Sequence, residues 1–164
     1  MKIRRILSAL LLAAMASTLG WAQSPKREIR STWLTTVWAI DWPSSTNQTR
    51  AKSQMTHYLD NLAKHNFTGV CFQVRGMADA MYRSSYEPWS SAISGTRGKD
   101  PGWDPLEWVV EECHKRGMEC YAWVNPYRES SSGKVYNTDF DREWQEKGWL
   151  LQYGDRIVFN PALP

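Results

Sequence analysis

Three short apolar runs, each ending in polar and aromatic side chains, are the feature that most constrains the fold of this chain. They lie within residues 31–43, 69–75 and 118–128. The first two runs are followed by a loop and a helical pattern, which predicts successive βα units of a parallel sheet and hence an α/β fold. Functional side chains in such sheets gather where strands end and the chain meets solvent. The polar and aromatic residues at these predicted strand ends are Asp41, Trp42, Gln73, Arg75, Asn125 and Tyr127.

The first 22 residues have the pattern of an export signal. Residues 1–5 are basic, residues 6–15 form an apolar stretch too short to span a bilayer, and Gly20 and Ala22 are the small residues that a signal peptidase reads. We therefore expect cleavage after Ala22 and a location outside the cytoplasm, either secreted or in the periplasm and envelope of a bacterium. An uncleaved membrane anchor is the alternative. No later segment is apolar for long enough to span a membrane.

The charge balance argues against nucleic acid as a partner. Formal net charge is +3, from 20 Lys and Arg against 17 Asp and Glu. Three of the basic residues lie in the predicted signal, so residues 23–164 carry no net charge and the basic surface typical of a nucleic-acid-binding protein is not expected.

Three cysteines, Cys71, Cys113 and Cys120, are an odd number for an exported protein. Their spacing does not match a zinc site, and neither a metal nor a cofactor is expected. Buried, unreactive thiols are one interpretation, and a bridge between Cys113 and Cys120 is the other.

Periodicity and capping signals predict the elements in more detail. Asp104-Pro105 with Glu107 is the strongest local signal, because it combines an N-cap, a proline at the first helical position and an acidic third residue. The same kinds of pattern predict strands over 29–37, 69–75 and 118–124, helices over 46–64, 104–116 and 139–147, and an ordered, site-covering loop over 76–102. Residues 150–159 are expected to form a hairpin that leads into a fourth barrel strand.

Tryptophan is unusually frequent, with ten in the chain. Trp42, Trp89 and Trp103 fall in loops after strands. There they can stack on sugar rings, or they can pin long loops to the sheet; the sequence leaves both interpretations open.

Two strand-end residues are suited to binding a ligand. Arg75 offers a planar donor fork for carboxylate or hydroxyl groups, or else is tied to a neighbouring carboxylate such as Asp41 or Asp79. Asn125 can donate to and accept from sugar hydroxyls, or else caps a turn. Asp41 and Asp79 are the acidic residues just beyond the first two strands, and hydrolysis of a glycosidic bond commonly needs two carboxyl groups.

Several ordered motifs resemble the glycosyl-hydrolase-like 10 family. They are the segment 30–37 leading to Asp41-Trp42-Pro43, the run 72–75 with 79–82 and 88–90, the segment 113–126, and Asn160-Pro161. The resemblance covers nearly all of residues 23–164. It implies a (β/α)8 TIM barrel and a secreted bacterial glycosidase, with cell-wall glycan as a substrate of some relatives.

The resemblance also implies what this chain lacks. Members of the family continue to an Asp-rich motif at the end of the fourth strand, where catalytic carboxylates are expected, and this sequence ends at Pro164. We therefore expect residues 23–164 to form about three to four βα units of the barrel, and assign no catalytic residue. The candidate substrate-binding residues are Asp41, Trp42, Arg75, Asp79, Tyr82, Trp123 and Asn125.

Two other functions stay open: a carbohydrate-binding module without catalysis, and an inactive truncated gene product. A partial barrel has an unpaired sheet edge, so self-association through that edge is expected. The expected partner is otherwise a glycan.

Overall fold

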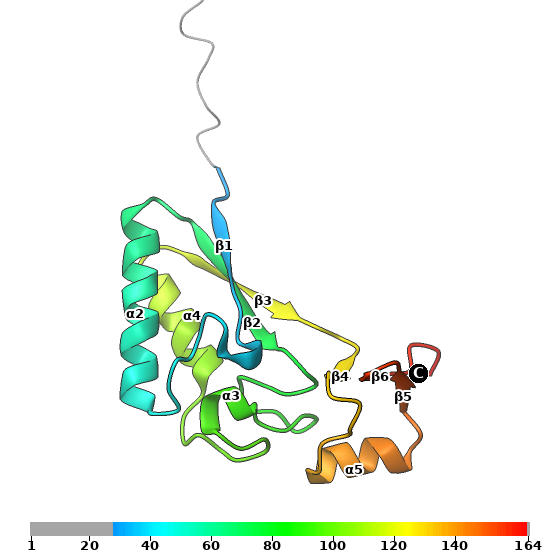
Figure 1. Ribbon diagram of the computed structural model, residues 1–164. Helices are drawn as coiled ribbons and strands as arrows, with labels where there is room; N and C mark the ends of the chain where they lie inside the picture. Colours follow the sequence, from blue (N-terminus) through cyan, green and yellow to red (C-terminus); the bar gives the residue numbers. More distant parts are fainter. Residues whose placement is uncertain (1–27, 164) are drawn as a thin grey trace, which may run out of the picture.

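The computed structural model describes residues 28–163 and contains a parallel three-stranded sheet (Figure 1). Its strands are β1 (Ser31–Leu34), β2 (Gly69–Arg75) and β3 (Glu119–Val124), and their order in the sheet is β1-β2-β3. Each strand pairs in parallel with its successor along the chain. This arrangement confirms the predicted α/β class and the first three predicted strands, although β1 ends earlier than predicted because residues 37–39 turn into a short 3-10 helix, η2 (Val37–Ala39).

Two helices, α2 (Gln48–Lys64) and α4 (Pro105–Lys115), cover one face of this sheet (Figure 1). The predicted N-cap of α4 is confirmed, since the Asp104 carboxylate accepts from the backbone N–H of Glu107. Helix α2 begins at Gln48, two residues later than predicted, because Asn47 caps it by accepting from the N–H of Arg50. Each helix closes the crossover between two neighbouring strands, as parallel pairing requires.

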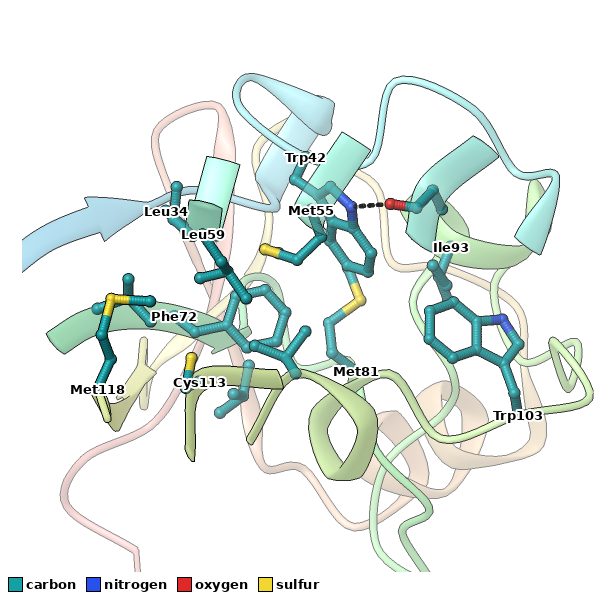
Figure 2. Packing of buried hydrophobic residues seen from close by; sticks show 14 residues of the cluster. Leu34, Trp42, Met55, Leu59, Phe72, Met81, Ile93, Trp103, Cys113 and Met118 are labelled. Atoms are coloured by element: carbon teal, nitrogen blue, oxygen red, sulfur yellow. Dashed lines mark hydrogen bonds between the residues drawn. The ribbon is translucent and has the colours of Figure 1, made fainter. Parts of the chain in front are cut away.

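The hydrophobic core lies between the sheet and these helices (Figure 2). Alternate residues of the strands, Leu34, Val70, Phe72 and Val74, point into it. Trp42 is fully buried there, its Nε1 donates to the carbonyl of Ala51 at 2.9 Å, and its ring meets those of Phe72 and Trp103 edge-on. The contacts of Trp42 and Trp103 match the interpretation in which loop tryptophans pin loops to the sheet.

The three cysteines are free thiols. Cys113 is buried in α4, and its hydrogen bond with Cys120 together with burial raises the pKa of its thiol. A thiol held in the protonated form is a poor nucleophile, so Cys113 matches the interpretation of a buried, unreactive thiol, whereas Cys71 and Cys120 are only partly buried.

The segment 76–102 is ordered, as predicted, and contains the short helix α3 (Ser91–Ser94). An isolated bridge joins Ala80 to Trp89, and the N–H of Leu106 bonds to the carbonyl of Met81. These bonds fold the loop against the start of α4.

A second, antiparallel sheet follows the first (Figure 1). It consists of β4 (Arg128–Ser130), β5 (Leu150–Tyr153) and β6 (Arg156–Phe159) in the order β4-β6-β5, and α5 (Asp139–Glu146) precedes the hairpin. The hairpin over 150–159 was predicted correctly, but β4 was not predicted. β6 pairs with β4 and β5, so within residues 28–163 the hairpin does not supply a fourth strand to the parallel sheet.

The other face of the parallel sheet is largely uncovered. Trp33 and Tyr121 on this face expose 61% and 42% of their surface, although Trp33 meets Trp123 edge-on at 4.8 Å. Gly69 lies on the same face, two residues before the Cys71 that pairs with both, and a Cβ at Gly69 would lie 3.0 Å from the Tyr121 ring. The aromatic side chains therefore lie close against the strands.

The predicted signal over residues 1–22 lies outside the described residues. In the described part of the chain, none of the helices combines the length and apolar character needed to cross a bilayer.

Replacing Trp42 by Phe tests the role of this ring. We expect Trp42→Phe to lower the free energy of unfolding by about 2 kcal/mol, because it removes a buried hydrogen bond and leaves a void. The control is Trp38→Phe, whose indole is 63% exposed, with an expected change within about 0.5 kcal/mol. Urea unfolding followed by circular dichroism measures both, and equal effects would contradict the burial of Trp42.

Candidate functional site

A cavity of about 430 Å³ opens at the carboxyl ends of β2 and β3, on the face of the sheet that α2 and α4 leave uncovered. Its lining includes two aromatic side chains, two side-chain amides and one cationic side chain. Its lining residues are Val37, Gln73, Trp123, Asn125, Pro126, Tyr127 and Arg128.

Asn125 ties the ends of β2 and β3 together. Its Oδ1 accepts from Trp123 Nε1 at 3.1 Å, and its Nδ2 donates to the carbonyl of Gly76 at 3.1 Å. The side chain thus has the predicted structural role of holding a turn, and it also fixes the orientation of the Trp123 ring. Trp123 presents an indole held from two sides, because Trp33 packs edge-on against it.

Arg75 is committed to partners within the protein. Its Nε donates to the Glu87 carboxylate, its Nη1 donates to the carbonyl of Asn125, and its guanidinium lies 5.7 Å from the ring centre of Phe159. The carboxylate partner is therefore Glu87, a loop residue that sequence reasoning missed, and neither Asp41 nor Asp79.

Tyr82 belongs to the same cluster. Its hydroxyl donates to Glu87 at 3.2 Å, and burial, followed by the negative charge of Glu87, raises the pKa of the phenol. Tyr82 therefore stays protonated and helps to position Glu87 against Arg75.

Asp79 shapes the turn after β2. Its Oδ1 accepts from the backbone N–H of Met77 at 2.8 Å and of Gly76 at 3.2 Å. It lines a second, smaller cavity of about 240 Å³, together with Thr36, Trp38 and Tyr136. Asp79 is thus near the main cavity without lining it.

Asp41 and Trp42 lie elsewhere. The Asp41 carboxylate accepts from the N–H of Thr35 at 2.7 Å, and the residue faces a separate cavity of about 420 Å³ between β1 and α2. Trp42 is enclosed by the core. The structure therefore brings together Arg75, Tyr82, Trp123 and Asn125, places Asp79 beside them, and separates Asp41 and Trp42.

A buried ion pair that the sequence did not reveal holds the site loop in place. The Arg97 guanidinium bonds to Asp141 at 2.8 Å, and the two side chains expose 8% and 0% of their surface. The same guanidinium donates to the carbonyls of Met77 and Ala78 at 2.8 and 2.9 Å. One side chain therefore fastens the turn after β2 to the start of α5.

Glu129, in β4, is an unusual acidic group close to this ion pair. It is fully buried, one oxygen accepts from the N–H of Tyr136 at 3.2 Å, and the other oxygen has no partner among the described residues. Burial raises the pKa of this carboxyl to about 7, against the opposing effect of Arg97. The sequence around Glu129 does not indicate its burial or its raised pKa, because the residue is buried only when β4 pairs with β6.

Arg128 brings a positive charge to the cavity. Burial, and secondarily the charge of Arg156, lowers the pKa of its guanidinium. The side chain is half-buried beside Trp38, with its Cζ 5.9 Å from that ring centre. Sequence reasoning missed it too, since it lies beyond the predicted strand end.

The lining of the cavity combines hydrogen-bonding and aromatic side chains with Val37 and Pro126, and it includes no carboxylate among residues 28–163. Within the same residues, no group of three or more His, Cys, Asp or Glu side chains is arranged to hold a metal ion. This set of groups is suited to binding a polar ligand with a ring face.

Comparison with known proteins identifies the family. A family profile described as Glycosyl hydrolase-like 10 matches residues 28–164. The chain belongs to this family. Over 143 residues it is 38% identical to the glycosyl hydrolase YngK of Bacillus subtilis, and this aligned region covers 84% of this chain and 28% of YngK. It is also 34% identical over 161 residues to the glycosyl hydrolase DigH of Escherichia coli K12, covering 87% of this chain and 37% of that protein.

This glycosyl hydrolase-like chain thus spans about a third of the length of the curated relatives that it matches. The resemblance predicted from the motifs is confirmed. The matched region includes every residue of the cavity and of the Arg75 cluster.

The buried ion pair makes a direct prediction. Arg97→Lys keeps the charge but loses the planar fork that reaches both Asp141 and the two carbonyls, so we expect a loss of about 3 kcal/mol in the free energy of unfolding. Arg142→Lys is the control, because Arg142 pairs with Asp139 on the exposed side of α5, and its expected cost is within about 0.5 kcal/mol. Denaturant unfolding measures both; similar small losses would contradict the proposed anchoring.

The raised pKa of Glu129 predicts an unusual pH dependence of the free energy of unfolding. Its pKa of about 7 in the folded state lies above the ordinary 4.5, so the folded chain binds more protons than the unfolded chain between these values. The contribution of Glu129 to the free energy of unfolding should fall as pH rises from about 4.5 to 7, by at most about 3 kcal/mol. Glu129→Gln should remove that fall and stabilise the protein at pH 8.

Thermal unfolding from pH 5 to pH 8 measures this dependence. Glu146→Gln, at an exposed position of α5, is the matched control and should leave the pH profile of the wild type unchanged. A wild-type profile that Glu129→Gln does not alter would show that Glu129 titrates normally.

Proposed function

We propose that this chain forms the substrate-binding part of an exported glycoside hydrolase that acts on bacterial cell-wall glycan. The observation that carries the proposal is the cavity at the carboxyl ends of β2 and β3 in a chain that belongs to a glycosyl hydrolase-like family. In α/β enzymes with parallel strands, this end of the sheet is where substrates bind.

The architecture supports a partial TIM barrel. Strands β1, β2 and β3 are sequential neighbours in one parallel sheet, with helices on a single face. In a barrel the helix-free face is the interior. Trp33, Trp123 and Gln73 would then point into the barrel, and three of its eight βα units would belong to the described residues.

The chemistry of the cavity supports a sugar as ligand. The Trp123 indole offers a flat apolar surface for a sugar ring, while Gln73 and Arg128 supply polar groups at its edge. Asn125 holds the Trp123 indole through its side chain, and Arg75 donates to the Asn125 carbonyl. Tyr82 in turn bonds to Glu87, the ion-pair partner of Arg75.

Hydrolysis would need carboxyl groups on both sides of the scissile bond. We propose that these come from a further part of a longer protein, since the relatives are about three times as long as the matched region. The second candidate, carbohydrate binding without turnover, is favoured by the same absence of a carboxylate from the cavity lining in residues 28–163.

We propose self-association for this part of the chain alone, because in a closed barrel the outer edge of β1 would pair with the last strand. The outer edge of β1 is unpaired in the described sheet, and the cavity beside it is lined by Thr32, Trp33, Leu34 and Phe67. An exposed strand edge with apolar neighbours favours pairing with a second copy.

Trp123 provides the test of glycan binding. We expect Trp123→Ala to weaken binding to insoluble bacterial peptidoglycan about tenfold, because it removes one stacking surface. Trp149→Ala is the control, since Trp149 is partly exposed beside Lys147 and outside the cavity. Sedimentation with peptidoglycan measures binding, and release of reducing ends measures turnover.

The outcomes separate the candidates. Binding with release of reducing ends supports the hydrolase, and binding alone supports the carbohydrate-binding candidate. Equal binding by the wild type and Trp123→Ala would place the glycan outside this cavity.

A further inference from the structure

We propose that Gln73 is a ligand-positioning residue whose side-chain amide group donates, together with Arg128, to the carbonyl oxygen of an N-acetyl substituent on a bound sugar. This inference rests on the proposed function, because it assumes that the cavity binds glycan. It adds the atom of the ligand that is recognised and the two residues that recognise it.

The orientation of the Gln73 amide is fixed by its neighbours. Its Oε1 accepts from the backbone N–H groups of Thr36 and Val37, both at 2.9 Å. The Thr36 hydroxyl lies 3.4 Å from the same oxygen and donates to the Gln73 carbonyl at 2.9 Å. Two backbone N–H groups can only meet an acceptor, so the amide cannot be turned around.

The Nε2 of Gln73 is therefore committed to point away from η2. Gln73 is fully buried, yet its Nε2 has no hydrogen-bond partner among the described residues. A buried donor without a partner is costly, and proteins retain such groups where something else supplies the acceptor. Gln73 pairs with Trp123 in the sheet, and both line the cavity of about 430 Å³.

Arg128 is the second donor in the same cavity. Its Nε donates to the carbonyl of Gly76 at 3.1 Å. No ion pair to a carboxylate, and no hydrogen bond from its terminal nitrogens, occurs within residues 28–163. Burial and the nearby cation Arg156 lower the pKa of this guanidinium, and the more weakly acting charge of Asp79 opposes them. The guanidinium therefore favours an electronegative ligand atom.

The chemistry of these two groups selects the ligand. A glutamine N–H₂ group and a guanidinium donate and cannot accept. A sugar hydroxyl that accepts from both donors still has its own proton to place and needs a further acceptor for it, whereas a carbonyl oxygen accepts through both lone pairs and carries no proton. The pair should thus favour a sugar that carries an acylated amine over one that carries only hydroxyl groups, with Trp123 supporting the ring.

Two oligosaccharides with the same β-1,4 backbone test this preference. Chitohexaose carries an N-acetyl group on every sugar, and cellohexaose has a hydroxyl at that position. We expect the complete chain to bind chitohexaose at least tenfold more tightly than cellohexaose in isothermal titration calorimetry.

The decisive variant is Gln73→Glu. It retains an oxygen to accept from Thr36 and Val37 and replaces the N–H₂ group with an acceptor. The preference for chitohexaose should disappear, so that the two hexamers bind within about threefold of each other. Gln145→Glu, at an exposed position of α5, adds the same charge outside the cavity and should keep the preference.

If Gln73→Glu does not fold, as judged by circular dichroism, the wild type still decides the question. The side-chain amide resonance of Gln73, identified by its proximity to the Thr36 and Val37 amides in NMR spectra, should shift with chitohexaose and not with cellohexaose.

The outcomes are distinct. Equal binding of the two hexamers, retention of the preference by Gln73→Glu, or an unmoved Gln73 resonance in the bound wild type would overturn this inference and leave glycan binding intact. A wild type that binds neither hexamer nor insoluble peptidoglycan would overturn the proposed function, and this inference with it.

Discussion

The contact on which the two halves of this structure depend is the one between Arg97 and Asp141. The first sheet and its helices form one packed unit, and the second sheet with α5 is a smaller one. Arg97 connects them, because it bonds at once to Asp141 in α5 and to two carbonyls in the turn after β2. A buried guanidinium needs such a complete set of acceptors to offset the loss of water. Arg97 thus fixes the turn after β2 with the help of Asp141, which lies 44 residues further along the chain.

Around this contact, most buried polar side-chain atoms take part in hydrogen bonds, and few are left without a partner. Thr138 and Arg97 share the carboxylate of Asp141, while Glu87 joins Tyr82 to Arg75. Three buried side-chain atoms in the described residues have no partner: Ser31 Oγ, Gln73 Nε2 and one oxygen of Glu129. Gln73 is buried but lines a cavity, whereas Glu129 lines none of the cavities described above and favours its protonated form. The lack of a hydrogen-bond partner thus has different consequences for Gln73 and for Glu129.

The elements that the sequence predicted are those with local causes. Asp104-Pro105 determines the start of α4, and the apolar run 69–75 forms β2 with the predicted bounds. The strand-end rule also anticipated that Arg75 and Asn125 would meet. What it missed depends on contacts between distant segments: β4 exists only through its pairing with β6, and Glu87 reaches Arg75 only because the loop folds back. Trp42 shows the same limit, since a strand-end position does not determine whether a ring turns toward the cavity or the core.

The edge-on pair of Trp33 and Trp123 also has an optical consequence. The two indoles lie with ring centres 4.8 Å apart on the uncovered face of the sheet, and one of them lines the cavity. Any molecule that covers this face, whether a sugar or another segment of protein, replaces water around both rings. The protein therefore carries a built-in fluorescent reporter of occupancy at the place where its proposed ligand would bind, and no added label is needed to read it.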